Sequence, residues 1–170
     1  MRATLCVLLL LGLVPLAQSD EPYRVGITAQ KKRLEVQRTQ TDSKEKVAEK
    51  WGYAITIANQ AFKDIPDVQV DYMIFYRTEA AGRAENATRD KRSSGSKNAG
   101  LLKNNTRFTC ETDPIALQKT ELNADWSYGN GAKRESRDVI TGIKVRVKSG
   151  ANVISEFADP ASLKSSEAWE

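Results

Sequence analysis

Two segments of this chain alternate large apolar side chains with small or polar ones, and this alternation constrains the fold more than any other feature of the sequence. The large residues are Trp51, Tyr53, Ile55 and Ile57 in residues 51–58, and Val68, Val70, Tyr72, Ile74 and Tyr76 in residues 68–76. Successive side chains point to opposite faces of an extended backbone, so a period of two is typical of a strand with one buried face. Met73 and Phe75 make the end of the second segment apolar on its other face as well, which predicts cover on both faces there.

A second pair of strands is predicted near the C-terminus. Residues 139–148 place mostly valine and isoleucine at odd positions and three cations, Lys144, Arg146 and Lys148, at even ones. Turn-forming residues 149–152 separate this strand from a short return strand at 153–157, and the two form a β-hairpin. The cations therefore make a basic row on the outer face, which opposite charges on a neighbouring strand would neutralise. If the strand instead lies at the edge of its sheet, the same charges would deter edge-to-edge aggregation.

Short strands between turn signals favour an all-β domain, a β-sandwich of about seven strands. They are predicted at 51–58, 68–76, 106–112, 139–148 and 153–157, with one or two more near 23–27 and 34–36. Residues 37–50 are polar and are interpreted as an exposed edge strand that runs into a loop. The same signals also fit a small barrel.

The C-terminal residues predict a short helix that packs on the domain. Asp159 is placed as its N-cap and Pro160 in its first turn, where proline is well tolerated. Leu163 and Trp169 are its expected anchors.

Residues 77–105 are interpreted as a long flexible loop, because they contain almost no large apolar residue before Leu101. The stretch is basic, with Arg89, Lys91 and Arg92 close together. An acidic polysaccharide or an anionic surface is a possible partner for this charge, while a solvated loop is the simpler interpretation. No aromatic residue lies in residues 83–103 to stack on bases, so we expect no nucleic-acid partner.

The N-terminus has the pattern of a secretory signal peptide over residues 1–19. Arg2 is followed by an apolar run of about a dozen residues and by the small residues Ala17 and Ser19. The run is too short for a spanning helix, so no stable membrane anchor is expected after cleavage. We therefore predict export to the periplasm or the extracellular space as a single domain of residues 20–170, with Cys110 as its one cysteine. Cys110 is either a buried thiol or half of an intermolecular disulfide.

Residues 53–59 and 67–76, together with the hairpin at 142–147 and 153–157, resemble paired strands of immunoglobulin-like or fibronectin-III-like domains. The tail from Ala158 to Leu163 is similar to that of small exported bacterial proteins of unassigned function. The resemblance implies a sandwich with no catalytic signature. The chain lacks the Cys…Trp…Cys pattern of antibody domains.

The chain has no histidine, which excludes serine and cysteine mechanisms that need one and all histidine-ligated metal sites. Glu111 and Asp113 are two residues apart and would suit acid–base hydrolysis of a glycoside only if they met in one pocket. We therefore expect no catalytic residues, no metal and no cofactor.

Trp126 and Tyr128 are the best candidates for a glycan-stacking platform, because they lie beside the turn-forming residues 129–131. Asn86 and Asn104 match the N-glycosylation pattern. The sequence thus predicts an exported, non-enzymatic structural or interaction module that binds a protein or glycan partner. The alternative is a carbohydrate-active enzyme or an enzyme inhibitor.

Overall fold

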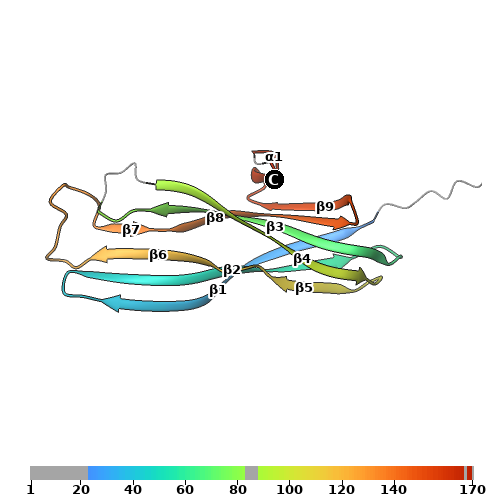
Figure 1. Ribbon diagram of the computed structural model, residues 1–170, viewed down its shortest axis with the longest axis horizontal. Helices are drawn as coiled ribbons and strands as arrows, with labels where there is room; N and C mark the ends of the chain where they lie inside the picture. The colour runs from blue at the N-terminus through green and yellow to red at the C-terminus, as the bar shows by residue number, and fades with distance from the viewer. Residues whose placement is uncertain (1–22, 83–87, 167, 170) are drawn as a thin grey trace, which may run out of the picture.

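The computed structural model describes residues 23–82, 88–166, 168 and 169, so the predicted signal peptide lies outside the described residues. Within that part, the chain forms nine strands and one short helix (Figure 1). The strands are β1 (Val25–Gln40), β2 (Lys44–Asn59), β3 (Ile65–Glu79), β4 (Thr88–Leu102), β5 (Arg107–Glu111), β6 (Ile115–Leu122), β7 (Glu135–Arg137), β8 (Val139–Ser149) and β9 (Asn152–Asp159). The helix is α1 (Leu163–Ser166). No described helix is long and apolar enough to cross a membrane.

The strands form two antiparallel sheets that lie face to face as an elongated sandwich (Figure 1). One sheet has the order β1-β2-β6-β7, with β5 pairing the other half of β2, and the second has the order β4-β3-β8-β9. Strand β2 is long enough to pair with β6 over its first half and with β5 over its second half. The prediction of an all-β sandwich is confirmed, and the separate sheets decide against a small barrel.

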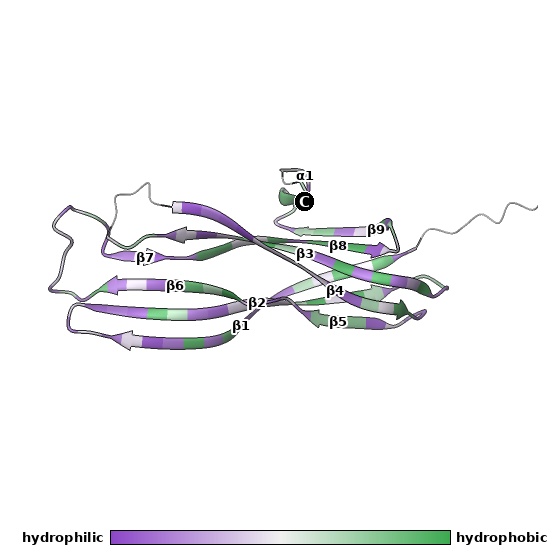
Figure 2. Cartoon of the chain, in the orientation of Figure 1, coloured by the Kyte–Doolittle hydropathy of each residue, from purple (hydrophilic) through white to green (hydrophobic). Residues whose placement is uncertain are grey.

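The predicted alternation is confirmed where the two sheets face each other. Tyr53, Ile55 and Ile57 of β2 are buried against the fully buried apolar positions of β3 and β8. Figure 2 shows the same concentration of hydrophobic residues toward the middle and one end of the sandwich. Met73 and Phe75 are also buried, on the opposite face of β3. Strand β3 therefore has cover on both faces near its end, as its sequence predicts.

The prediction of a flexible loop over residues 77–105 is wrong. Strand β4 occupies Thr88–Leu102 and pairs with β3 from Ile65 to Glu79, at the edge of its sheet. A strand at an edge bonds to a neighbour on one side only, so it needs little apolar surface of its own. The basic residues Arg89, Lys91 and Arg92 consequently lie on an ordered strand, and five neighbouring positions, 88–92, are exposed.

Strands β6 and β7 lie between residues 112 and 139, where the sequence analysis predicts no strand. The N-terminal third forms the longest hairpin of the fold, in which β1 and β2 pair from Val25 with Asn59 to Gln40 with Glu45. A bulge between Arg33 and Glu35 interrupts that register. Nine described strands thus replace the predicted seven or so.

The C-terminal segment folds back over the outer face of the β4-β3-β8-β9 sheet (Figure 1). The predicted short helix exists, but Asp159 is not its N-cap, because Asp159 still pairs with Ile143 as the last residue of β9. Helix α1 begins only at Leu163. Leu163 is so close to Gly142 that a side chain there would lie 2.4 Å from Leu163 Cδ1, which makes Leu163 an anchor, as predicted.

Candidate functional site

Asp138 shapes one end of the molecule, because the chain passes there from one sheet to the other. Strand β7 belongs to the first sheet and β8 to the second, and Asp138 is the single residue between them. Its carboxylate accepts hydrogen bonds from the backbone N–H of Glu79 at 3.0 Å and of Gln118 at 2.9 Å. Each carboxylate oxygen thus accepts a bond from a different sheet, so Asp138 ties the end of β3 to β6.

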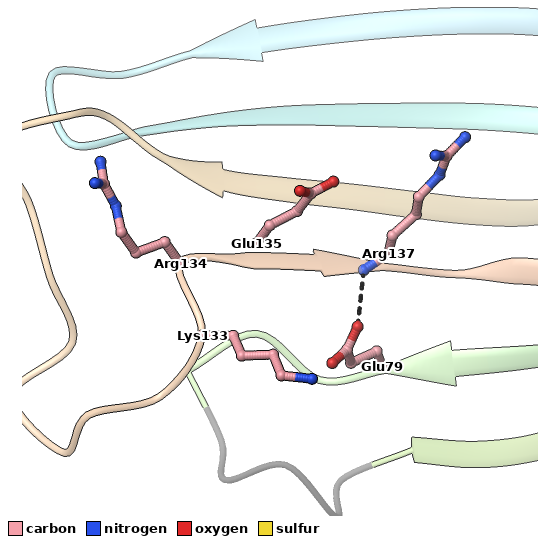
Figure 3. A pocket seen from close by; sticks show the side chains of 5 residues that line it. All are labelled: Glu79, Lys133, Arg134, Glu135 and Arg137. Carbon is pink, nitrogen blue, oxygen red and sulfur yellow. Dashed lines mark hydrogen bonds between the residues drawn. The ribbon is translucent and has the colours of Figure 1, made fainter.

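A shallow, open cleft of about 530 Å³ lies beside this crossing (Figure 3). Five charged residues line it: Glu79, Lys133, Arg134, Glu135 and Arg137. The Glu79 carboxylate accepts a hydrogen bond from the backbone N–H of Arg137 at 3.2 Å. Glu135 and Arg137, two residues apart on β7, project toward β6 in Figure 3. Three cations and two carboxylates make the lining mixed but slightly basic.

The loop over residues 123–134 carries the predicted glycan-binding residues and adjoins this cleft. Trp126 is half-exposed, and its backbone N–H bonds the carbonyl of Asn123 at 3.0 Å. The guanidinium of Arg134, which lines the cleft, donates to the same carbonyl at 2.7 Å. The Trp126 backbone and the Arg134 guanidinium therefore bond the same carbonyl oxygen, which links this loop to one residue of the cleft lining.

Tyr128 has a different environment from Trp126. A Cβ atom at Gly82 would lie 2.9 Å from the Tyr128 ring, so the ring packs directly on the turn that follows β3. The side chain of Asn130 also donates to the Gly82 carbonyl, at 2.9 Å. Tyr128 thus docks the loop on the sandwich, and Trp126 is the more accessible ring of the two.

The basic row predicted on β8 is neutralised by the neighbouring strands. Arg146 bonds Glu156 of β9 at 2.8 Å, and Lys148 pairs with Asp71 of β3. The ring of Trp169 lies 5.1 Å from Lys144 Nζ and 4.3 Å from the Arg146 guanidinium. Cations over an aromatic face are attracted by its quadrupole. This row therefore holds the C-terminal segment in place, and Trp169 is the anchor that the sequence predicts.

A second charged surface lies on the β1–β2–β6–β7 sheet. Directly paired residues share a face, and one such row contains Arg38, Val47, Lys119 and Arg137. The next row contains Glu45, Glu121 and Glu135, so cations and carboxylates alternate along the strands. Lys119 bonds Glu121 at 3.0 Å and Glu135 at 3.3 Å. The charges on this surface largely satisfy one another.

Trp51 occupies the boundary between this charged surface and the core. Its indole N–H donates to Glu49 at 2.8 Å, and Lys31 lies 4.6 Å above its ring. The hydrogen bond from Trp51, with a smaller one from Arg33, holds the pKa of Glu49 below its ordinary value despite partial burial. Trp51 packs against the core, as its alternation predicts, and does not form part of an exposed platform.

The two carboxylates that an enzyme would need do not face one partner. Glu111 bonds Lys32 of β1 at 2.6 Å, whereas Asp113 bonds Lys97 of β4 at 2.8 Å. The two lysines belong to different sheets. The Lys97 and Tyr72 hydrogen bonds lower the pKa of Asp113. A lowered pKa suits an ionised structural carboxylate better than a general acid at neutral pH.

Cys110 is a half-buried free thiol that packs against the core. Burial raises the pKa of its thiol, which keeps it protonated and poorly nucleophilic at neutral pH. No group of three or more metal-ligating side chains occurs among the residues that the structure describes. Asn104 is exposed in the turn before β5, while Asn86 lies outside the described residues.

Comparison with known proteins gives no identity. No family model and no curated protein matches this chain. Solved structures that align over most of it include the following three. An X-ray structure of a structural genomics target is 12% identical, with a TM-score of 0.33, over 86% of this chain and 95% of that one. A structural genomics target from Bordetella pertussis is 15% identical, with a TM-score of 0.28, over 81% of this chain and 93% of that one. An Akkermansia muciniphila protein is 9% identical, with a TM-score of 0.26, over 86% and 73%.

Sequence reasoning identified Trp126 and Tyr128 but missed the cleft beside them. Glu79, Lys133, Arg134, Glu135 and Arg137 come from two segments far apart in sequence. A local signal did exist, since Glu135, Ser136 and Arg137 alternate as a short strand does. Three residues are too few to distinguish such a strand from a polar loop.

Proposed function

We propose that this chain is an exported, non-enzymatic interaction module whose loop-bearing end binds a glycan or protein partner. The observation that carries the proposal is the half-exposed Trp126, fixed through Asn123 to the wall of a cleft of about 530 Å³. A planar ring covers the apolar face of a sugar or the side chain of a protein, and nearby charged groups orient the ligand. Loops held by a rigid sandwich are a common place for recognition.

The strand order supports an immunoglobulin-like interpretation of this module. Strands β3 and β4 form a hairpin, β8 and β9 form a second one, and β3 pairs with β8 between them. The other sheet places β1, β2 and β6 side by side. Immunoglobulin-like sandwiches combine adjacent strands in this manner. The signal-peptide pattern of residues 1–19 supports a location in the envelope or the extracellular space.

The enzyme alternative has no specific observation in its favour. It needs two carboxylates near one reacting bond, about 5–10 Å apart. Glu111 and Asp113 instead form ion pairs with lysines of different sheets. The carboxylates of the cleft, Glu79 and Glu135, each have a neighbour of their own: Glu79 accepts the Arg137 N–H and Glu135 pairs with Lys119.

A glycan array and a pull-down with the mature chain test the proposal. Trp126→Ala removes the half-exposed ring and should reduce any specific signal at least tenfold. Phe62→Ala is the matched control, because Phe62 is 87% exposed in the connection between β2 and β3. Binding that survives Trp126→Ala, or that both variants weaken equally, would refute the loop-bearing end as the binding site. Unchanged melting temperatures show that both variants are folded.

A further inference from the structure

One long edge of the sandwich combines an open backbone with two cations that no described residue neutralises. Strand β4 is the edge strand of its sheet. It approaches the other sheet at Lys97, which forms an ion pair with Asp113, and at its last residue, Leu102, which is buried. The stretch Thr88–Ser96 lies before these contacts, and residues 88–92 are all exposed. Alternate residues of an antiparallel strand direct their backbone N–H and C=O groups away from the neighbour. About half of the polar backbone groups of Thr88–Ser96 therefore point away from β3.

The other long edge strand differs in its charges. On β1, Lys32, Arg33 and Glu35 have ion-pair partners at 2.6, 3.2 and 2.7 Å. On β4, the Arg89 and Lys91 side chains have neither a hydrogen bond nor an ion pair with any described residue, and no charge opposes them on β3, where they pair with Thr78 and Tyr76.

The neighbouring acid on β4 does not compensate these two cations. Asp90 points to the opposite face and bonds Arg77 of β3 at 2.8 and 3.3 Å. That bond lowers the pKa of Asp90 and keeps it ionised, so its charge is committed to Arg77. Arg89 and Lys91 therefore form a pair of like charges on one face, about 7 Å apart along the strand.

We propose that the β4 edge, Thr88–Ser96, is a docking site for an extended peptide strand of a partner protein with acidic residues at alternate positions. The partner strand would add to the sheet through backbone hydrogen bonds, and two of its carboxylates would lie opposite Arg89 and Lys91. The inference rests on the proposed role as an interaction module, but it uses a surface that is separate from Trp126.

Charge decides between this occupant and the two others. A second copy of β4 would bring Arg89, Lys91 and Arg92 against the same cations, and like charges in opposite positions destabilise a strand pair. An acidic glycan would neutralise the cations but would leave the outward backbone groups without strand partners. An acidic strand satisfies both the charge and the backbone.

The test uses two synthetic nonapeptides, one of alternating threonine and glutamate and one of alternating threonine and lysine. The glutamate peptide should bind the mature chain at low ionic strength, weaken with salt, and protect amides of Thr88–Ser96 from hydrogen exchange. The lysine peptide should not bind. The double variant Arg89→Glu/Lys91→Glu should weaken binding of the glutamate peptide about tenfold or more, because two attractive pairs become repulsive.

The matched control is Lys46→Glu/Arg107→Glu, which changes the net charge equally at two exposed positions of the other sheet. It should bind the glutamate peptide as the wild type does. The proposal is overturned if the two peptides bind alike, or if binding leaves Thr88–Ser96 unprotected. It is also overturned if protection appears without peptide and grows with protein concentration, which indicates a second copy.

Binding of a sulfated polysaccharide that depends on Arg89 and Lys91, with no amide protection and no peptide binding, would instead identify an acidic-glycan surface and overturn the peptide proposal. Trp126→Ala should not affect peptide binding. If the glutamate peptide does not bind, but another partner binds in a way that depends on Trp126, then the β4 edge proposal is rejected and the proposed function is kept.

Discussion

The close contact between Gly95 and Tyr72 makes the strongest stability prediction. Gly95 of β4 lies directly opposite Tyr72 of β3. A Cβ atom at Gly95 would be 2.3 Å from the Tyr72 hydroxyl oxygen and 2.5 Å from Cζ. Tyr72 is 1% exposed and accepts a hydrogen bond from the Asp113 N–H at 2.9 Å, which crosses to the other sheet. The ring therefore cannot move aside without losing that bond.

The expected cost of Gly95→Ala follows from these contacts. Overpacking a core position costs about 1–3 kcal/mol, and a lost hydrogen bond adds about 0.5–1.5 kcal/mol. Alanine also lowers the conformational entropy of the unfolded chain, which stabilises the folded state by about 0.4–1 kcal/mol. Gly95 is not among the glycines with positive φ, so its backbone accepts alanine. The cost therefore comes from the steric clash and from the hydrogen bond that the displaced Tyr72 ring would lose. The net destabilisation should be about 0.5–4 kcal/mol, or roughly 1–16 °C in Tm for a domain of this size.

Urea unfolding of Gly95→Ala, monitored by tryptophan fluorescence, measures this cost. Gly129→Ala is the control, because no atom lies within 4 Å of a Cβ at that position. It should leave stability unchanged or raise it by up to about 1 kcal/mol, through the restricted unfolded chain alone. In a Tyr72→Leu background the clashing atoms are gone, so Gly95→Ala should cost less than half as much there. A Gly95→Ala variant within 0.5 kcal/mol of wild type, or an equal cost in both backgrounds, would refute the reasoning.

Two predictions concern pH. Burial raises the pKa of Asp71, but hydrogen bonds from Lys148, Gln69 and Ser96 outweigh it, so the folded-state pKa lies below the ordinary 3.8. The unfolded state then binds the proton more tightly, and this contribution to stability is lost as the pH falls through the lowered pKa. Asp71→Asn should flatten the decline of the urea midpoint below about pH 4; an unchanged decline would contradict the assignment. Burial, with a smaller effect of Asp159, raises the pKa of Tyr53 to about 12. Stability should therefore fall as the pH rises from about 10 to 12, and Tyr53→Phe should remove part of that loss; an equal loss in the variant would count against it.

The core strands could be predicted because their period is local. Strands β2, β3 and β8 each have a neighbouring strand on both sides and one buried face. Each therefore carries large apolar residues at every second position, such as Ile55 in β2, Ile74 in β3 and Val145 in β8. The full length of β1 and β2 could not be predicted. On the N-terminal side of Trp51, the face of β2 that carries Tyr53 and Ile55 becomes charged. Glu49 of β2 and Lys119 of β6 occupy positions on this face where an apolar residue would have indicated a strand.

The candidate site was predictable only in part. Trp126 stands beside turn-forming residues, which is a local signal for an exposed ring. The cleft next to it depends on Asp138, whose two backbone hydrogen bonds reach residues 59 and 20 positions away. Contacts of that sequence separation follow from the sheet order and are absent from any local pattern.

Strand β4 was misread for the same physical reason that leaves its edge open. Its inward positions face large side chains of β3: Ser93 is opposite Ile74, and Gly95 is opposite Tyr72. Because β3 supplies the volume, β4 needs only small residues there, and its own sequence shows no apolar period. The information that makes it a strand is therefore the complementarity of two segments, large against small, and the Gly95→Ala experiment measures that complementarity directly. A strand that contributes so little apolar surface can remain unpaired on its outer side without promoting aggregation, and its charges determine which strand it accepts.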